Sequence, residues 1–348
     1  MSNRPDEPFS WRGVLAPLLR GEDLREDDAR AAMREILAGE ATSAQIAALA
    51  TGLRIKGETA EELTGLVKAM LDAAGKLEVA GPLIDTCGTG GAGTFNASTL
   101  AAIVVAGAGG RVAKHGNRAA SGRCGSADLL EALGVVITLP PAGVRATIEA
   151  TGIGFCFAPV FHPAMRHAIP TRRELGVPTV FNFLGPLTNP ARAGHQAMGV
   201  VDPAMAPKMA EVLRRTGIRH AWVFTGGDGL DELTTTTSSR VLDVRPDGIT
   251  EHTVDPAGLG IAPPAREQLL GGDVEHNVAI TRALLGGEDG PLRDLVLLNA
   301  AAALVAGDLA PDLEAGMQLA ATAVDSGRAA AALDAWAESS RTVAKDLG

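Results

Sequence analysis

Residues 85–99 read DTCGTGGAGTFNAST, a run in which four glycines are followed by short polar residues. The glycines at 88, 90, 91 and 93 let backbone N–H groups approach an anion with no Cβ in the way. Asn96, Ser98 and Thr99 come where a helix is expected to begin, so they cap its first turn or direct polar groups at a ligand held by the helix dipole. The stretch by itself fits a phosphate-binding loop and also a plain glycine turn between a strand and a helix.

The segments after this stretch alternate between strands and helices. We expect a short buried strand at 83–84, a helix at 100–106 that ends at the glycines 107, 109 and 110, and a strand at 111–113, which together make a βαβ unit. Helices at 126–133 and 142–150 and strands at 135–137 and 153–157 continue the alternation. The pattern predicts an α/β fold with a mostly parallel sheet, helices on both of its faces, and functional groups at the carboxyl ends of its strands.

The region before the glycine stretch has a different pattern. Residues 26–80 read as successive helices, with Gly39 ending one and Thr42 and Thr59 capping the next two. We therefore expect a small all-helical domain over residues 1–80, joined by helices from about 185–215, and a large α/β domain over 81–348. The alanine-rich faces of the helical domain suit an interdomain surface and a dimer surface equally well.

Composition excludes several classes of protein. The chain has 348 residues and a formal net charge of −10, and aromatic residues make up only 3% of it, which argues against nucleic acid as a partner. It contains no signal peptide and no apolar run of membrane-spanning length, so we expect a cytoplasmic protein without a membrane partner. The three cysteines at 87, 124 and 156 are widely spaced, which fits a reducing compartment.

Charge placement indicates an anionic ligand. No acidic residue occurs between Asp85 and Asp128, a segment that contains Arg111, Lys114, Arg118 and Arg123. From 150 to 201 the single acid Glu174 is set against four arginines. In an acidic chain, such segments predict a focused positive pocket.

A cluster of the opposite sign occurs at residues 225–233, which read TGGDGLDEL. It contains three carboxylates, and no basic residue follows before Arg240. Oxygen ligands on a loop after a strand suit Mg²⁺, which combines one or two carboxylates with substrate phosphates. The alternative is a solvated acidic turn capped by the threonines 234–237.

Two other patterns have competing interpretations. Gly88, Gly90 and Gly93 match a dinucleotide-binding fingerprint, but Lys114 and His115 stand where the acid for the ribose is expected, which leaves only an arginine-reading NADP variant. The histidines 115, 162 and 167 suggest a metal or nucleophilic site, but no serine or cysteine elbow accompanies them. Histidines in such loops are more often structural or part of a pocket wall.

Eight motifs in this order resemble those of the anthranilate phosphoribosyltransferase family. They are GTGG at 88–91, TFNAST at 94–99, KHGNRAAS at 114–121, GSAD at 125–128, FAP at 157–159 with HPAMRH at 162–167, RRELG at 172–176, FNFLGPLTNP at 181–190 and GLDE at 229–232. Residues 39–42, 56–59, 271–273 and 298–301 are similar as well, so the resemblance covers almost the whole chain.

The resemblance implies a helical domain hinged to a large α/β domain, a homodimer through the helical domain, and the transfer of a phosphoribosyl group from phosphoribosyl pyrophosphate to anthranilate in tryptophan biosynthesis. It implies Mg²⁺ held by Ser98, Asp231 and Glu232. It places anthranilate against Gly88, Asn117, Pro159, His162, Met165 and Arg172. The implied donor-binding residues are Gly88, Thr89, Gly90, Gly91, Thr94, Asn96, Ala97, Ser98, Thr99, Lys114, His115, Gly116, Asn117, Arg118, Ser121, Gly122 and Ser126.

The implied reaction needs little acid–base catalysis, because an aromatic amine is neutral at pH 7 and attacks the ribose as pyrophosphate leaves. The main tasks are to stabilise charge on the leaving group and to hold the two substrates in line. We therefore assign no general base, and His115 is the only candidate to accept the proton of the amine.

The glycine stretch also departs from the family pattern. The pattern has an aspartate where this chain has Ala92, and the loop here is shorter by about two residues. A milder departure is Thr171, where an apolar residue is common. Weakened metal or donor binding, altered substrate inhibition and an inactive paralogue follow as alternatives. So do an enzyme for another aromatic acid or amine, a pyrimidine-nucleoside phosphorylase and a non-catalytic binding protein.

Overall fold

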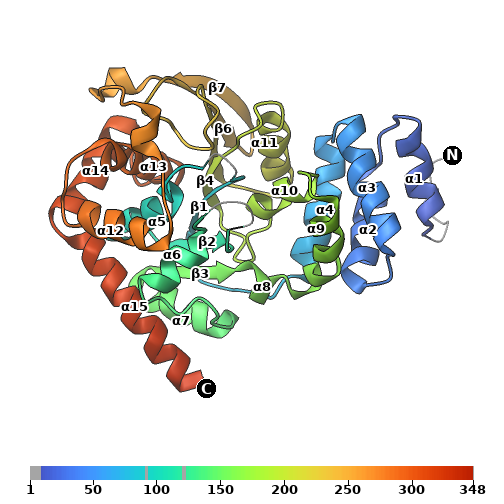
Figure 1. Ribbon diagram of the computed structural model, residues 1–348, viewed down its shortest axis with the longest axis horizontal. Coiled ribbons are helices and arrows are strands. Elements are labelled where there is room, and N and C mark those ends of the chain that lie inside the picture. The colour runs from blue at the N-terminus through green and yellow to red at the C-terminus, as the bar shows by residue number, and fades with distance from the viewer. Residues whose placement is uncertain (1–8, 91–92, 120–122, 348) are drawn as a thin grey trace.

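The computed structural model describes residues 9–90, 93–119 and 123–347. It has a helical lobe and a larger lobe built on a seven-stranded sheet (Figure 1). This arrangement confirms the predicted fold class. The helical lobe contains α1 (Trp11–Leu19), α2 (Glu26–Ala38), α3 (Ser43–Lys56) and α4 (Ala60–Ala73).

Local sequence signals set the ends of these helices. α2 ends at Gly39, whose φ of 81° suits a residue without a side chain. Thr42 and Gln45 form a capping box at the start of α3, and Thr59 and Glu62 form another at the start of α4. The predicted helices of this lobe are thus confirmed, whereas α1 lies before the region in which helices were expected.

The sheet has the strand order β3-β2-β1-β4-β5-β6-β7. The first five strands in this order are parallel, and the last two are antiparallel to their neighbours. The carboxyl ends of the five parallel strands therefore lie along one edge. The strands are β1 (Ile84–Gly88), β2 (Val112–Gly116), β3 (Ile153–Phe157), β4 (His195–Gly199), β5 (His220–Gly226), β6 (Ser239–Arg245) and β7 (Gly248–Val254).

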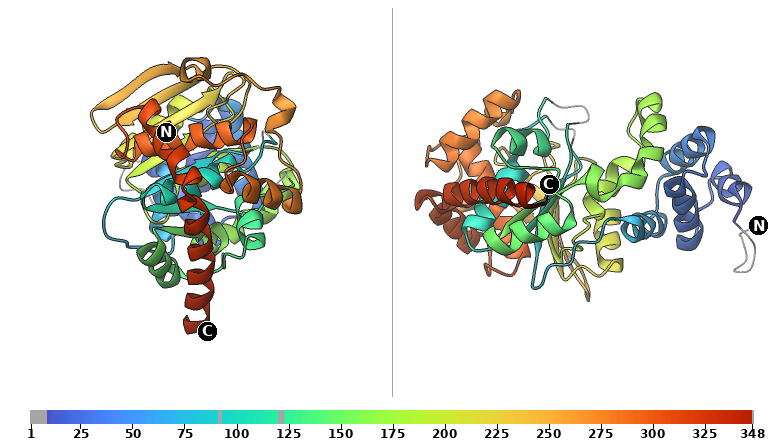
Figure 2. Two further views of the ribbon diagram at one scale, coloured as in Figure 1. Left: turned by 90° about the vertical axis from the view of Figure 1, so that its left-hand side faces the viewer. Right: turned by 90° about the horizontal axis from the view of Figure 1, so that it is seen from below.

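Helices cover both faces of the sheet, as predicted. One face packs against α5 (Ala97–Gly107), α6 (Ser126–Ala132), α12 (Val274–Leu285), α13 (Pro291–Ala306), α14 (Leu313–Asp325) and α15 (Arg328–Leu347), and α15 projects beyond the lobe toward the C-terminus (Figure 2). The other face packs against α7 (Pro141–Thr151), α10 (Phe181–Leu184), α11 (Ala206–Arg215) and the helical lobe. Shorter turns are α8 (Ala158–Phe161), η1 (Pro163–His167), α9 (Ile169–Leu175), η2 (Gly185–Leu187), η3 (Pro256–Leu259) and η4 (Arg266–Leu269).

One predicted strand is wrong. Residues 135–137 do not join the sheet, although Val135 and Ile137 are buried in its core. The N–H of Val136 instead donates to the hydroxyl of Ser340 in α15, 3.0 Å away. The apolar run is thus buried by packing against a helix, which a short β-branched segment permits as well as strand pairing does.

The two lobes share an apolar core. α9 lies against α3, while α10 and α11 lie against α4. Phe181 and Phe183 of α10 and Met209 of α11 belong to the same buried cluster as Leu63 and Met70 of α4. Among the helices of the described residues, none combines the length and the apolar character that crossing a membrane requires.

Candidate active site

The glycine stretch leaves the sheet at its carboxyl edge. β1 runs through Gly88, and the N–H of Thr89 then donates to the carbonyl of Gly199 at the end of β4, 3.0 Å away. The chain returns at Thr94, which pairs with Leu270, and α5 begins at Ala97. Gly91 and Ala92 lie outside the described residues, and with them the predicted departure from the family pattern.

The acidic loop after β5 is pressed against this glycine loop. The N–H of Gly90 donates to Oδ2 of Asp231 over 2.6 Å. A Cβ on Gly88 would clash with that same carboxylate, and a Cβ on Gly199 would clash with the backbone of Asp231. Glycine at both positions is therefore what allows the acidic loop to cross the ends of β1 and β4.

Asp231 and Glu232 are buried carboxylates with few hydrogen-bond donors. Burial raises the pKa of Asp231, an effect that the Gly90 N–H partly offsets. Burial, and then the charge of Asp231, raise the pKa of Glu232 well above its ordinary value. Burial makes the anionic form of both carboxylates unfavourable, and a divalent cation bound between them would stabilise both charges. The pair therefore suits such a cation.

Asp228 of the same loop has a different role. Its Oδ2 accepts the hydroxyls of Thr234 and Thr236 at 2.8 and 2.5 Å, and its Oδ1 accepts the N–H of Leu230 at 3.3 Å. The capped-turn interpretation of the loop is thus correct for this carboxylate. Within the described ranges, no three histidine, cysteine or acidic side chains gather to hold a metal. A cation at Asp231 and Glu232 would need further oxygens from Ser98 and the substrate.

Lys114 lies beneath the start of α5 with only 1% of its surface exposed. Its ammonium donates to the carbonyl of Thr86 over 2.6 Å and to the hydroxyl of Ser98 over 3.5 Å. Burial lowers the pKa of Lys114, and the negative charges of Asp85 and Glu232 act against that shift. A buried cation, the first turn of a helix and a glycine loop therefore meet at the carboxyl edge of the sheet, an arrangement suited to phosphate groups.

His115 follows Lys114 and is neutral in this environment. Its Nδ1 donates to the carbonyl of Gly185 over 3.1 Å, which leaves the buried Nε2 without a partner among the described residues. Burial, and next the adjacent His162, lower the pKa of His115 to about 3. The two imidazole rings lie 5.2 Å apart, and Nε2 of His162 donates to the carbonyl of Thr188 over 2.9 Å. His115 is thus a weak base, and the two histidines are anchored to backbone carbonyls.

Two arginines of the acid-free segment, which was predicted to form a focused positive pocket, have partners within the chain. Arg118 pairs with Asp128 at 2.9 Å and with Glu131 at 2.8 Å, both of them on α6. Arg111 donates to the carbonyl of Ala80. The prediction of a positive pocket is therefore wrong for these two arginines, and the buried cation at the glycine loop is Lys114. Ser121 and Gly122, also predicted to bind the donor, lie outside the described residues.

Several of the residues predicted to contact anthranilate lie on turns next to the helical lobe, where η1 packs against α2 and α9 packs against α3. Pro159 belongs to α8, Met165 to η1 and Arg172 to α9. The guanidinium of Arg172 lies 5.6 Å from the ring of Phe181, and no carboxylate in the described ranges pairs with it. Burial lowers the pKa of Arg172. A half-buried arginine without an acidic partner suits a carboxylate ligand.

Two asparagines that the sequence analysis did not assign hold the loops in place. Asn277 donates to Oδ1 of Asn96 over 2.9 Å, and Asn96 in turn donates to the carbonyl of Cys124 over 3.0 Å. Asn96 thus joins loops and makes no side-chain cap of α5. Asn299 of α13 bonds both the N–H and the carbonyl of Leu233, each over 3.0 Å, and so braces the acidic loop. The sequence signal that could have identified Asn299 is its polar amide side chain within the apolar run of α13.

Sequence comparison identifies the relatives of the chain. Residues 12–74 match the helical bundle domain of the glycosyl transferase family, and residues 80–330 match its α/β domain. An anthranilate phosphoribosyltransferase of Acidothermus cellulolyticus is 56% identical over 340 residues, which cover 95% of this chain and 96% of the relative. The chain belongs to the anthranilate phosphoribosyltransferase family. Another relative with that name, from Thermobifida fusca, is 53% identical over 97% of this chain and 99% of its own length.

Solved structures of the anthranilate phosphoribosyltransferase family have the same fold. The enzyme of Thermus thermophilus superposes with a TM-score of 0.89 at 45% identity, covering 94% of this chain and 99% of that one. The enzyme of Saccharomyces cerevisiae, in complex with PRPP and Mg, superposes with a TM-score of 0.88 at 25% identity, covering 95% of this chain and 98% of that one. The resemblance stated from the motifs is therefore confirmed.

Proposed function

We propose that this chain transfers the phosphoribosyl group of phosphoribosyl pyrophosphate to the amine of anthranilate. The products are N-(5-phosphoribosyl)anthranilate and pyrophosphate, in the second step of tryptophan biosynthesis from chorismate. The observation that carries the proposal is the meeting of the glycine loop, Lys114 and the Asp231–Glu232 pair at one edge of the sheet, in a chain of this family. These groups offer N–H donors, a cation and cation-binding carboxylates to a pyrophosphate.

In this proposal the pyrophosphate of the donor lies over the glycine loop and the first turn of α5. Lys114 holds its positive charge next to Ser98, where it stabilises negative charge on the departing pyrophosphate. Ser98, Asp231 and Glu232 would hold Mg²⁺, which when bound neutralises charge on the leaving group. The yeast relative described with PRPP and Mg supports this assignment.

The acceptor lies between this edge and the helical lobe. Arg172 binds the carboxylate of anthranilate, and Asn117, Pro159, His162 and Met165 complete the wall around the ring. No residue needs to remove a proton before the amine attacks, because the amine is already neutral. The low basicity of His115 is consistent with a reaction that depends on charge stabilisation and alignment.

We propose further that the chain forms a homodimer in the cytoplasm through a helical domain of residues 1–80, completed by helices from about 185–215. Leu19 of α1 and Ile55 of α3 are 88% and 83% exposed, which is consistent with a surface that a second copy would cover.

The direct test is to incubate the purified chain with anthranilate, phosphoribosyl pyrophosphate and Mg²⁺ and to follow the loss of anthranilate fluorescence. We expect a loss that requires all three components and a product with the mass of phosphoribosylanthranilate. Other aminobenzoates, and a pyrimidine nucleoside with inorganic phosphate, serve as comparison substrates. No loss at high enzyme concentration, or faster turnover of a comparison substrate, would contradict the proposal.

A further inference from the structure

The carboxylate of Asp128 joins the two ends of the loop between β2 and α6. Its Oδ2 accepts the N–H of Ala119 at 3.0 Å and the N–H of Gly125 at 2.9 Å. A single oxygen thus holds the chain where it leaves the sheet and where it enters α6. We call this arrangement the Asp128 clasp. Residues 120–122, inside the loop, lie outside the described part of the chain.

The second oxygen of Asp128 holds Arg118. Its Oδ1 accepts Nη1 of Arg118 at 2.9 Å, and the same guanidinium makes two bonds of 2.8 and 3.0 Å to Glu131, one turn further along α6. Burial pushes the pKa of Asp128 upward, but the two N–H donors and Arg118 outweigh it and keep that pKa below its ordinary value. The clasp therefore has a stable anionic centre with three donors.

The clasp lies directly behind two residues of the proposed site. The hydroxyl of Ser126 and the N–H of Ala127 both donate to the carbonyl of Asn117, at 3.1 and 3.2 Å. A Cβ on Gly125 would clash with the N–H of Ala119, so the two ends of the loop are in close contact there. The relative position of Asn117 and Ser126 is thus set by backbone contacts that Asp128 closes.

We propose that Asp128 is a positioning residue for the phosphoribosyl donor, and that Arg118 acts through this clasp and does not itself contact a phosphate. The proposal rests on the proposed function, because it takes Asn117 and Ser126 as parts of the substrate site. Asp128 touches no substrate. It holds the ends of the loop so that Asn117 and Ser126 meet the donor in one arrangement.

The test compares D128N with the control E131Q. An asparagine at 128 keeps the size of the side chain but removes the charge and replaces one acceptor by a donor. E131Q weakens only the exposed part of the Arg118 pairing. We expect D128N to raise the Kd of phosphoribosyl pyrophosphate with Mg²⁺, measured by calorimetry, and its KM by about ten-fold or more, with a smaller change in kcat. E131Q should change both by less than about two-fold.

A second measurement uses no substrate. Trypsin cuts after arginine, so opening of the clasp should speed cleavage after Arg123, located by mass spectrometry, in D128N but not in E131Q. R118Q is the alternative if D128N does not fold, because it leaves both N–H bonds to Asp128 in place. It should raise the Kd and KM of the donor and speed cleavage after Arg123, in each case by less than D128N.

Equal Kd values for D128N and the unaltered protein, or equal losses in D128N and E131Q, would overturn the proposal. So would a fall in kcat and thermal stability without a rise in Kd. If the unaltered protein binds the donor but does not turn over anthranilate, the proposed function fails, while the binding and cleavage comparisons still decide the role of Asp128.

Discussion

The two ends of the parallel sheet place their ionisable side chains in different surroundings. At the amino ends of the strands, His220 is 1% exposed and lies between Asp308, 2.9 Å from Nδ1, and Asp243, 3.2 Å from Nε2. The indole N–H of Trp222 adds a bond of 3.1 Å to Asp243. Both carboxylates thus lie within ion-pair distance of the same imidazole.

At the carboxyl ends, Lys114 and Asp231 make hydrogen bonds to uncharged groups, and within the described residues neither they nor Glu232 form an ion pair. Burial lowers the pKa of Lys114 and raises those of Asp231 and Glu232. These shifts mean that the folded chain disfavours the charged forms, which bound substrate and cation would restore. We infer that the amino end of the sheet contributes to stability, whereas the carboxyl end holds ionisable groups in unfavourable surroundings that suit a functional site.

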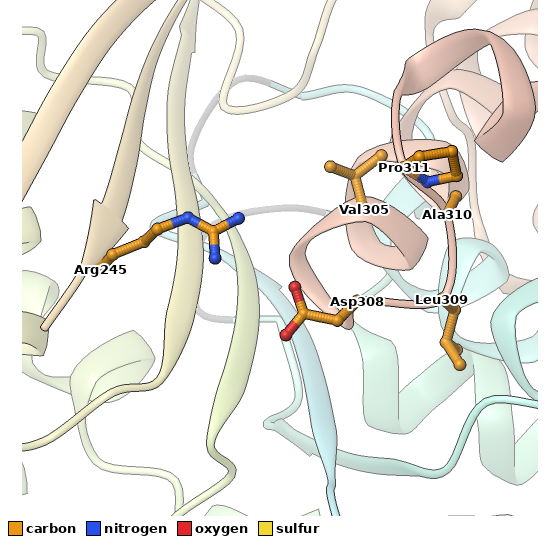
Figure 3. A pocket seen from close by; sticks show the side chains of 6 residues that line it. All are labelled: Arg245, Val305, Asp308, Leu309, Ala310 and Pro311. Atoms are coloured by element: carbon orange, nitrogen blue, oxygen red, sulfur yellow. The ribbon is translucent and has the colours of Figure 1, made fainter.

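A cavity of about 400 Å³ at the amino end illustrates the difference. It is lined by Arg245, Val305, Asp308, Leu309, Ala310 and Pro311, with the side chains of Arg245 and Asp308 pointing toward each other (Figure 3). The charges of this cavity offset each other, and Asp308 is already bonded to His220. It therefore lacks the excess of donors that a polyphosphate requires.

The largest expected effect comes from neutralising the carboxyl end. The double variant D231N/E232Q should lose at least about 1000-fold in turnover, because it removes the proposed cation ligands. It should also unfold at a higher temperature, because two buried carboxylates no longer have to be desolvated. Turnover by the fluorescence assay and melting by calorimetry test both statements.

D228N is the control, since Asp228 lies in the same loop but is bonded to two threonine hydroxyls. It should melt at a lower temperature and keep the magnesium dependence of the unaltered protein. An unchanged metal dependence in D231N/E232Q would return the whole loop to the capped-turn interpretation.

Breaking the pairing at the amino end should have the reverse result. H220A leaves Asp243 and Asp308 without their shared partner and should lower the free energy of unfolding by about 2–3 kcal/mol, measured by urea denaturation. Its kcat and KM should stay within about two-fold, because the site lies at the other edge of the sheet. D308N, which retains an acceptor for His220 at a half-exposed position, should cost less than about 1 kcal/mol. A loss of activity larger than the loss of stability would show that the two ends are coupled.

Arg172 offers a third test of the unpaired charges. R172A should raise the KM for anthranilate by about 10- to 100-fold, because it removes the proposed charge-assisted bond to the carboxylate of the acceptor. Binding of phosphoribosyl pyrophosphate, measured by calorimetry, should be nearly unchanged. Equal losses of anthranilate use and of donor binding would mean that Arg172, whose guanidinium lies over the ring of Phe181, has a structural role.

The two ends should also respond to pH with opposite sign. At the amino end burial raises the pKa of Asp243, but His220 and Trp222 outweigh that effect and keep it below its ordinary value. Its contribution to stability is therefore present above about pH 4 and is lost as the pH falls through the lowered pKa. At the carboxyl end the raised pKa values mean that the folded chain binds more protons than the unfolded chain above about pH 4. Stability should fall there as the pH rises through the raised values.

Melting temperatures of the metal-free protein across pH 3–9 separate the two effects. D231N/E232Q should reduce the fall in stability that begins above about pH 4, and H220A should flatten the acid side. If each variant altered the part of the profile expected for the other, or if neither profile changed, the two ends of the sheet would not differ in the way we propose.

The smallest expected effect concerns Thr171, whose buried hydroxyl has no hydrogen-bond partner among the described residues. T171V keeps the shape of the side chain and should raise the free energy of unfolding by about 0.5–1 kcal/mol in urea denaturation. The matched substitution T147V removes a bond of 2.8 Å to the carbonyl of Val144 and should lower it by about 1 kcal/mol. A loss of stability in T171V would show that this hydroxyl has an unrecognised partner.

Much of the fold could be predicted from the sequence because its signals are local. Capping boxes at Thr42 and Thr59 and the left-handed glycine at 39 depend on residues three or four positions apart. Residues 135–137 could not be assigned in this way. An apolar β-branched run records that the segment is buried, but does not record whether a strand or α15 buries it.

A candidate site could be proposed from the sequence where one segment supplies the chemistry, as in the glycine loop and the Asp231–Glu232 pair, which the structure brings together. It was not predictable where distant segments meet. Asn277 reaches Asn96 from 181 residues away, and no local pattern encodes that bond. Arg118 was counted in an acid-free segment, but its partners Asp128 and Glu131 lie 10 and 13 residues further on, just past the segment's end.

The glycines under the acidic loop have a consequence for efforts to change the acceptor by directed evolution. Any side chain at 88 or 199 would displace Asp231 before it met a substrate. A mutant library that randomises these positions would consist mainly of inactive clones, whatever the new acceptor. Pro159 and Met165, which we propose to contact the acceptor, lie on other turns, so we expect their substitution to leave the carboxylates in place. We therefore expect productive substitutions for new acceptors at those turns of the proposed site.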